Sequence, residues 1–433
     1  MPALDSETDT STDASTDAYV ADFARFISAA PSSYHAAEEV ARRLEEAGFE
    51  RLDDRDEWPT GAGRRVVVRD GSVIAWVQPE GAIATTPFRI LGAHTDSPSF
   101  KLKPNPSSSA EGLLQAGVEI YGGPLLNSWL DRELELAGRI VTDDGAQHLV
   151  RTGPMLRIPQ LAIHLDREVN SGLTLDKQRH MQPIWGVGAS GDLLAELAGI
   201  AGVPAERIAG HDLLVADTAP PARFGLGEAF FAAGRMDNLS SVYGGLVALL
   251  EAPADAGHVS VLAAFDHEEV GSGSRSGASG PALEDVLIRI GIGLGAGENE
   301  RRRAFAASWL LSSDAGHAVH PNYPERHDPR NHPVLGGGPL LKLHANQRYA
   351  SDAVGSALWT GICRQAGVTT QSFVSNNAIP CGTTIGPLSA TRLGIRTVDV
   401  GAPLLSMHSA RELAHVDDLA ALGAAVTAFF APA

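Results

Sequence analysis

Two adjacent glutamates, Glu268 and Glu269, stand where the chain could do chemistry. They follow the apolar run Val259–Phe265, which has the length and residue types of a buried strand, and the chain then turns at Gly271 and Gly273. An open α/β sheet usually keeps its active site at such strand ends. A Glu–Glu pair alone is more often a pair of solvated turn residues, so its interpretation depends on partners elsewhere in the chain.

Four further polar residues also stand at the end of an expected strand or the start of an expected helix: His94, Asp237, Asp314 and His408. Imidazole and carboxylate are the usual zinc ligands other than thiolate, so this set suits two zinc ions. Two ions can polarise a carbonyl and lower the pKa of a bridging water. Adjacent glutamates can then divide the labour, because one binds metal while the other acts as general base.

Each of these residues also has a plainer interpretation. His94 and His408 could be hydrogen-bonded structural residues, Asp237 could be an N-cap, and Asp314 could form a turn with His317. Their shared position at the ends of elements favours a site. Asp96, two residues after His94, can face the same side and hold the imidazole ring.

The elements that must position these residues alternate in type along most of the chain. We expect an α/β fold whose sheet-and-helix domain is interrupted by a β-rich insertion. Helices are predicted at 19–29, 34–47, 239–252, 350–365 and 419–433, and strands at 65–69, 72–77, 88–93, 259–265, 307–311, 370–374 and 397–400. Residues 102–224 have short alternating segments, many Gly and Pro, and one clear helix near 189–199. The catalytic domain is therefore predicted at 18–101 and 225–433, after a disordered acidic tail at 1–17.

Composition narrows the functional classes. The 433 residues carry a formal net charge of −18, which disfavours nucleic acid and anionic membranes as partners. The apolar stretch at 419–433 is too short to span a bilayer. Two cysteines, Cys363 and Cys381, are too few for a disulfide framework, and no signal peptide is recognisable, so we expect a cytoplasmic protein.

Six motifs in this order resemble those of the aspartyl aminopeptidase family, which includes vacuolar aminopeptidase I. They are His94-Thr-Asp96-Ser-Pro, Met236-Asp237-Asn-Leu, Phe265-Asp-His-Glu268-Glu269-Val-Gly-Ser, Ser313-Asp314-Ala-Gly-His317-Ala-Val-His320-Pro-Asn-Tyr, Asn346-Gln-Arg-Tyr-Ala and Ser406-Met-His408-Ser. The resemblance covers nearly the whole chain after the tail. It implies a di-zinc exopeptidase in which a zinc-exopeptidase-like α/β/α sandwich is interrupted by the β-rich insertion, and the insertion is a dimerisation domain. The subunits would assemble from dimers into a dodecamer.

The resemblance also implies residue roles. His94 and Asp314 would hold one zinc, Glu269 and His408 the other, and Asp237 would bridge them, with Glu268 as general base. Co²⁺ or Mn²⁺ could substitute for Zn²⁺. The peptide bond between Asp237 and Asn238 is expected to be cis.

Three further positions are assigned by the resemblance. His164 matches a histidine that the dimerisation domain lends to a neighbouring subunit's active site, with an ordinary strand histidine as the less favoured alternative. Lys342 matches a lysine that receives an acidic side chain, with a solvated lysine as its alternative, and His317 is placed with it in substrate binding. The segment 373–386 lacks the Arg and Asp of the form Val-Arg-Asn-Asp-Ser-Pro-Cys-Gly, which puts a strict acidic preference in question.

The predicted function is removal of one N-terminal residue, preferably Asp or Glu, from peptides by metal-activated water. The alternatives are a related di-zinc peptidase or deacylase of other specificity, and a catalytically silent scaffold of the same fold. A silent scaffold has no need for both glutamates and every presumed ligand, which favours the enzyme.

Overall fold

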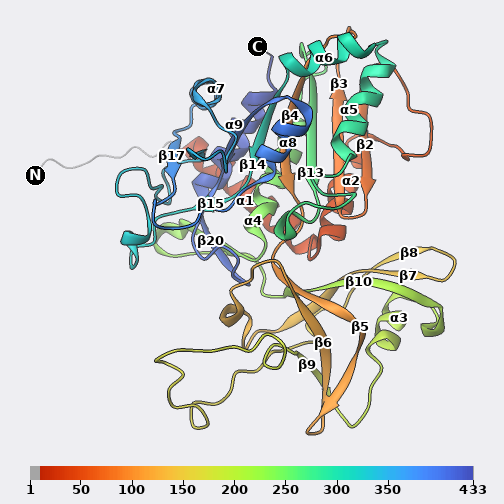
Figure 1. The fold of residues 1–433 in the computed structure, drawn as a ribbon, viewed down its shortest axis with the longest axis vertical. Coiled ribbons are helices and arrows are strands. Elements are labelled where there is room, and N and C mark those ends of the chain that lie inside the picture. Colours follow the sequence, from red (N-terminus) through yellow and green to blue (C-terminus); the bar gives the residue numbers. More distant parts are fainter. Residues whose placement is uncertain (1–9, 433) are drawn as a thin grey trace, which may run out of the picture.

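A mixed nine-stranded sheet forms the centre of the larger part of the protein in the computed structural model, which describes residues 10–432 (Figure 1). Its order is β1 (Glu50–Arg51), β2 (Gly63–Arg69), β3 (Ser72–Gln78), β13 (Val259–Phe265), β4 (Phe88–His94), β14 (Trp309–Ser313), β18 (Arg396–Gly401), β16 (Leu340–Leu343) and β17 (Gln371–Val374). The neighbours β13, β4, β14 and β18 run parallel. Their carboxyl ends therefore meet at one edge of the sheet.

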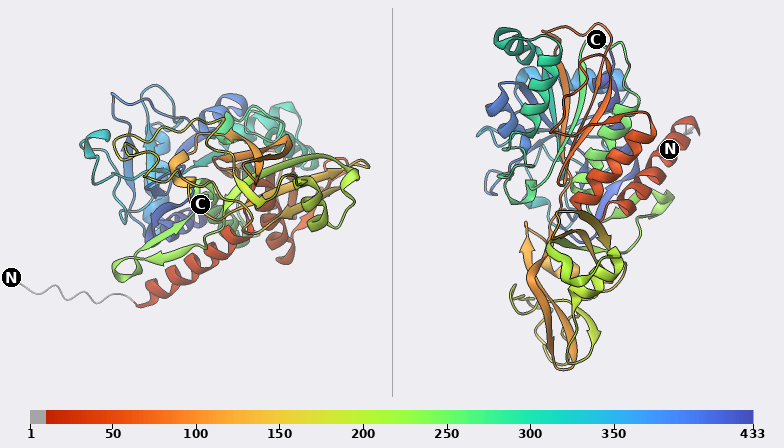
Figure 2. Two further views of the ribbon diagram at one scale, coloured as in Figure 1. Left: turned by 90° about the horizontal axis from the view of Figure 1, so that it is seen from below. Right: turned by 90° about the vertical axis from the view of Figure 1, so that its right-hand side faces the viewer.

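Helices cover both faces of this sheet, as Figure 2 shows with α1 and α2 on one side and α5 on the other. One face packs against α1 (Thr10–Ala29), α2 (Ser33–Glu46), α4 (Met236–Leu250), α7 (Ala353–Ala366) and α9 (Val416–Phe430). The other face packs against α5 (Ala282–Gly293), α6 (Glu298–Ala307) and α8 (Ile385–Leu393). Every residue of β13 is buried, as expected for a strand covered on both sides. The predicted α/β/α sandwich is confirmed.

A second, antiparallel sheet of six strands lies below the sandwich in Figure 1. Its order is β8 (Gln147–Arg151), β7 (Leu134–Thr142), β10 (Ile208–Asp217), β5 (Ser99–Ala110), β6 (Leu113–Tyr121) and β9 (Ile184–Val187). Helix α3 (Leu193–Ala201) packs with it around a separate apolar core that includes Phe100 and Trp129. The sheet is thus a β-rich unit inserted between β4 and α4.

The insertion differs from the expected range 102–224 at both ends. β5 already begins at Ser99, and β11 (Ala222–Phe224) pairs with β12 (Phe230–Ala233), which pairs in turn with β20 (Glu412–His415). Residues 222–224 therefore belong with the C-terminal part of the chain. Their position in the sequence suggested that they belong to the insertion, whereas their backbone pairing joins them to the sheet of β12 and β20.

Helix α1 overlaps the segment that was expected to be a disordered tail. Residues 10–17 belong to this helix, and residues 1–9 lie outside the described part of the chain. Thr16 is buried, and Asp17 forms an ion pair with Arg223, so tertiary contacts hold the end of this polar segment next to residue 18. The structure has a helix at 10–17, where the composition had indicated a disordered tail.

The C-terminal helix α9 packs into the core through residues such as Leu422 and Phe429, as predicted. Across residues 10–432, no helix combines the length and the apolar character needed to cross a bilayer.

Candidate metal centre

The predicted site residues meet at the edge where the central parallel strands end. His94 is the last residue of β4, and Asp314 directly follows β14. Glu268 and Glu269 lie in the short 3₁₀ turn Glu268–Val270 after β13. His408 follows β18 and the short strand β19 (Pro403–Leu404), and Asp237 lies at the start of α4. Five segments distant in sequence thus supply one cluster.

Asp237 lies between the two histidines. Its Oδ1 is 3.3 Å from Nε2 of His94, and its Oδ2 is 3.4 Å from Nε2 of His408. Each histidine also lies near a second carboxylate. His94 Nε2 is 3.9 Å from Asp314 Oδ2, and His408 Nε2 is 3.6 Å from Glu269 Oε2. The Asp237–Asn238 peptide bond is cis, as the resemblance implied.

Backbone carbonyls fix the orientation of both imidazole rings. Nδ1 of His94 donates to the carbonyl oxygen of Asp96 at 3.0 Å, and Nδ1 of His408 donates to that of Gly123 at 3.0 Å. A carbonyl oxygen only accepts, so Nδ1 carries the proton in each ring. Nε2 of each ring faces the carboxylates and is the nitrogen that can bind a cation between them, the arrangement that a metal-binding histidine needs.

The ligand chemistry of the cluster fits cations. Donor atoms converge in three groups: His94 with Asp237 and Asp314, Asp237 with Glu269 and His408, and His94 with Glu268 and Glu269. Within the described residues, the buried oxygens Asp237 Oδ1 and Glu269 Oε1 have no hydrogen-bond partner. Burial, followed by the charge of Asp237, raises the pKa of Glu269 well above its usual range. Divalent cations would offset both the unsatisfied oxygens and the excess negative charge.

Glu268 differs from Glu269 in its neighbours. Both residues are partly buried, but Glu269 belongs to two of the converging groups, and Glu268 only to the one that it shares with Glu269 and His94. Burial, then the charges of Asp314 and Asp237, raise the pKa of Glu268. A carboxylate with a raised pKa and access to the cluster is suited to accept and return a proton.

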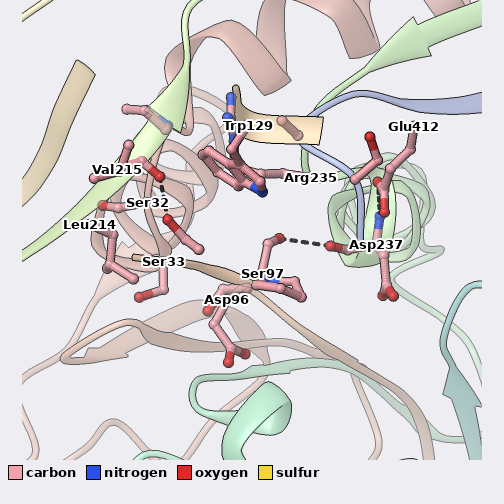
Figure 3. A pocket seen from close by; sticks show the side chains of 16 residues that line it. Ser32, Ser33, Asp96, Ser97, Trp129, Leu214, Val215, Arg235, Asp237 and Glu412 are labelled. Atoms are coloured by element: carbon pink, nitrogen blue, oxygen red, sulfur yellow. Dashed lines mark hydrogen bonds between the residues drawn. The ribbon is translucent and has the colours of Figure 1, made fainter. Parts of the chain in front are cut away.

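Two buried carboxylates hold the cluster through backbone N–H groups. Asp96 accepts from Glu268 N at 3.0 Å and from Glu269 N at 3.1 Å, so it positions both glutamates as well as the His94 ring. Glu412 accepts from Asp237 N at 3.0 Å and from His408 N at 2.9 Å. Figure 3 shows Glu412 beside Asp237, with Asp96 further along the same cavity. The sequence predicted Asp96 but not Glu412.

Glu412 was missed because it acts on main-chain atoms of residues that are distant in sequence. The one available signal was a glutamate at the start of the short run Glu412-Leu-Ala-His415, four residues after His408. In the structure it is the first residue of β20 and is buried.

Lys342 does not lie where a substrate lysine was expected. It is 2% exposed, and its Nζ donates to the carbonyl oxygen of Ala315 at 2.7 Å and to Asp314 Oδ1 at 3.2 Å. Its ammonium group is thus buried and already bonded within the chain. In the structure, Lys342 forms an ion pair with Asp314 instead of the expected contact with a substrate.

His317 and His164 lie outside the metal-binding groups. His317 is exposed and lines a cavity of about 230 Å³ together with Arg326 and residues 373–376. His164 is exposed in the turn-rich segment 159–183 of the inserted unit, between the exposed side chains of Ile163 and Leu165. The structure does not bring His164 to the cluster of its own chain.

A three-layer α/β sandwich that gathers histidines and carboxylates beyond its central parallel strands is the arrangement of a metal-dependent hydrolase. The family model described as aminopeptidase I zinc metalloprotease (M18) matches residues 26–430. The chain belongs to this family of zinc aminopeptidases, which confirms the resemblance and the predicted class of enzyme.

Known proteins resemble the chain over nearly its whole length. A protein of Streptomyces avermitilis named probable M18 family aminopeptidase 2 is 54% identical over 416 residues, 94% of this chain and 96% of the relative. A protein of the same name from Mycobacterium leprae is 45% identical over 422 residues, 95% of this chain and 98% of the relative.

Solved structures are also similar to this chain over nearly its whole length. Ape4 in its complex with Nbr1 superposes with a TM-score of 0.92 at 35% identity, covering 96% of this chain and 86% of that one. The mApe1 dodecamer of S. cerevisiae gives a TM-score of 0.83 at 28% identity, covering 95% and 96%.

Proposed function

We propose that this zinc aminopeptidase holds two zinc ions and releases a single N-terminal residue, preferably Asp or Glu, from peptides. The observation that carries the proposal is the position of Asp237, whose two carboxylate oxygens each face one histidine. His94 and Asp314 would complete one site, and Glu269 and His408 the other. Two groups of three ligands that share a carboxylate suit a two-metal hydrolase.

The residues around the ions divide the reaction among them. When bound, zinc would supply Lewis-acid chemistry, polarising the scissile carbonyl and acidifying the attacking water. Glu268 would take the proton of that water and return one to the leaving amine. Asp96 and Glu412 would keep the ligands in place through the backbone hydrogen bonds described above.

The cavity beside His317 supports the acidic preference. Besides His317, its polar lining includes Arg326, His327 and His332, and no Asp or Glu belongs to the lining formed by the described residues. In a chain with a net charge of −18, such a cavity is the more favourable place for a carboxylate. Residues 373–376 and 379–382 form one wall, so the segment that departs from the expected motif would face the substrate.

Assembly and location are part of the proposal. A homo-oligomer built from dimers, and as large as a dodecamer, is supported by the similarity to the mApe1 dodecamer. The exposed Ile163 and Leu165 beside His164 would be covered by a neighbouring subunit, to which His164 would be lent. Both cysteines are free, which suits the cytoplasm.

One experiment tests the activity and its specificity together. Purified enzyme is assayed on matched peptides that begin with Glu, Asp, Gln, Leu or Lys, before and after chelation and zinc return. We expect activity that chelation removes and zinc restores, with kcat/KM for Glu at least about tenfold above Gln, the difference of one charge contact. Equal turnover of Glu and Gln peptides would overturn the acidic preference, and full activity without metal would overturn the mechanism.

A further inference from the structure

The inserted β-rich unit contacts the metal cluster of its own chain through three consecutive residues at the end of β6. These are Tyr121, Gly122 and Gly123. They leave the six-stranded sheet and cross to the edge of the nine-stranded sheet. Each of the three touches a different part of the cluster.

Tyr121 reaches Asp96. Its hydroxyl donates to Asp96 Oδ2 at 2.8 Å, the same oxygen that accepts from Glu269 N. The other oxygen of Asp96 accepts from Glu268 N. An ionised carboxylate only accepts, so Tyr121 is the donor that completes the fixed orientation of Asp96.

The two glycines reach Glu269 and His408. Gly122 has φ +68°, and a Cβ on it would stand 3.2 Å from Cβ of Glu269, so its backbone packs directly on that residue. The carbonyl of Gly123 accepts from Nδ1 of His408, and Leu125 N donates to the carbonyl of His408 at 2.9 Å. Both sides of the His408 segment are thus tied to the inserted unit.

We propose that Tyr121 is a positioning residue for the metal centre, through which the inserted unit sets zinc affinity and turnover within the same chain. Its hydroxyl bonds to Asp96 rather than to a presumed metal ligand. Its hydroxyl restrains Asp96, and Asp96 in turn restrains His94, Glu268 and Glu269. This role is separate from any contact that the inserted unit makes with another subunit.

The test compares two tyrosines that make the same kind of bond. Tyr243 donates its hydroxyl to Asp22 Oδ2 at 2.7 Å, away from the cluster, and is the matched control for Tyr121. Tyr121→Phe and Tyr243→Phe each remove one hydroxyl bonded to a carboxylate. Zinc affinity is measured on the metal-free proteins by competition with a chelating dye, and kcat, KM, Tm and assembled mass are measured beside it.

For Tyr121→Phe we expect zinc affinity and kcat each to fall about tenfold, the lower end for partners of metal ligands, with KM within about twofold. Tyr243→Phe should lower Tm without changing zinc affinity or kcat. A Tyr121→Phe protein that matches the wild type in zinc affinity and kcat, and changes only in Tm, overturns the inference.

The inference rests on the proposed ligand set, and the same measurements separate the two. A wild-type protein that binds no zinc would overturn the proposed function. A wild-type protein that binds zinc and cleaves peptides, with Tyr121→Phe doing the same, would overturn the positioning role alone.

Discussion

Glu268 and Glu269 are neighbours in the chain with different surroundings. The side chain of Glu269 is 5% exposed and converges with Asp237 and His408 as well as with His94, whereas Glu268 converges only with His94 and Glu269. Asp96 holds the backbone N–H of both, so the turn that carries them has little freedom to exchange their positions. The division into general base and ligand follows from this fixed turn.

Glu268→Gln should lower kcat by about 10²–10⁴-fold, because the amide cannot take a proton from the attacking water. Zinc content should stay at the wild-type level, as measured by elemental analysis of the assembled protein. Glu269→Gln is the contrast, since it should lose zinc as well as activity. Turnover of Glu268→Gln within about threefold of the wild type would remove this residue from the base role.

Lys342→Met should act on stability before it acts on specificity. Removing one partner of a buried ion pair costs about 3–5 kcal/mol, because Asp314 loses its buried counter-charge. Lys101→Met is the control: Lys101 pairs with Asp212 at 2.8 Å but is one-third exposed, so about 1 kcal/mol or less is expected. Denaturant unfolding gives both values. An intact stability with a KM raised only for acidic peptides would restore the substrate role of Lys342.

Single residues could be predicted from the sequence where their role depends on the end of an element. His94, Asp237, Glu269, Asp314 and His408 each follow a strand or begin a helix, so alternation of elements was enough to group them. Glu412 and Tyr121 could not be found in this way, because their partners are a backbone N–H and a carboxylate set by tertiary structure. The burial of Lys342 likewise depends on β16 pairing with β18 and β17 inside the sheet, which the order along the chain does not reveal.

At the scale of elements, the central strands were predictable because they are continuous apolar runs. β13 and β4 match their predicted ranges within one residue. Helices α5, α6 and α8 were missed for different reasons. α5 carries Gly291 and Gly293, α6 is strongly charged, and α8 has only nine residues with Pro387 in its first turn, where proline is tolerated.

Two helical glycines should respond oppositely to alanine. In α4, a Cβ on Gly245 would stand 2.3 Å from Leu91 Cδ2 and 2.6 Å from Leu262 Cδ1, so Gly245→Ala should cost about 1–3 kcal/mol through overpacking. In α7, a Cβ on Gly361 would meet nothing within 4 Å, so Gly361→Ala should stabilise by about 0.5–1 kcal/mol. Denaturant unfolding measures both changes. A stabilising Gly245→Ala would contradict the close packing of α4 on β4 and β13.

At the scale of the whole molecule, one buried histidine links the start of β13 to the C-terminal end of α9. His258 directly precedes β13 and is 4% exposed. Its pKa is affected by the charge of Arg89 and by a hydrogen bond with the backbone of Phe430. Burial, followed by the charge of Arg89, lowers the pKa of His258 from 6.5 to about 4. The folded protein therefore keeps this imidazole neutral where the unfolded chain would protonate it.

This histidine should make stability depend on pH. Between pH 6.5 and about 4 the unfolded chain binds a proton on His258 that the folded protein does not bind. The contribution of His258 to the free energy of unfolding is therefore complete above pH 6.5 and is lost as the pH falls. His258→Gln should flatten the fall in unfolding free energy across that window. His148→Gln, on the half-exposed β8, is the control. Measurements on metal-free protein keep zinc loss out of the comparison, and an unchanged slope for His258→Gln would refute the assignment.

The fold class of the whole molecule could be predicted from the sequence, and the boundaries of the inserted unit only roughly. Alternating strands and helices identify a sandwich, but the pairing of β11 with β12 and β20 joins residues nearly two hundred positions apart, beyond what local pattern can reveal.

The spacing of the cluster along the chain has a consequence for biosynthesis. His408 and Glu412 leave the ribosome roughly 300 residues after His94 and Asp96. A chain whose synthesis stops before residue 408 has neither this histidine nor the carboxylate that holds Asp237. Under the proposed ligand set, chains that stop before residue 408 are therefore inert, and peptide-cleaving activity becomes possible only after the segment 408–412 has been made.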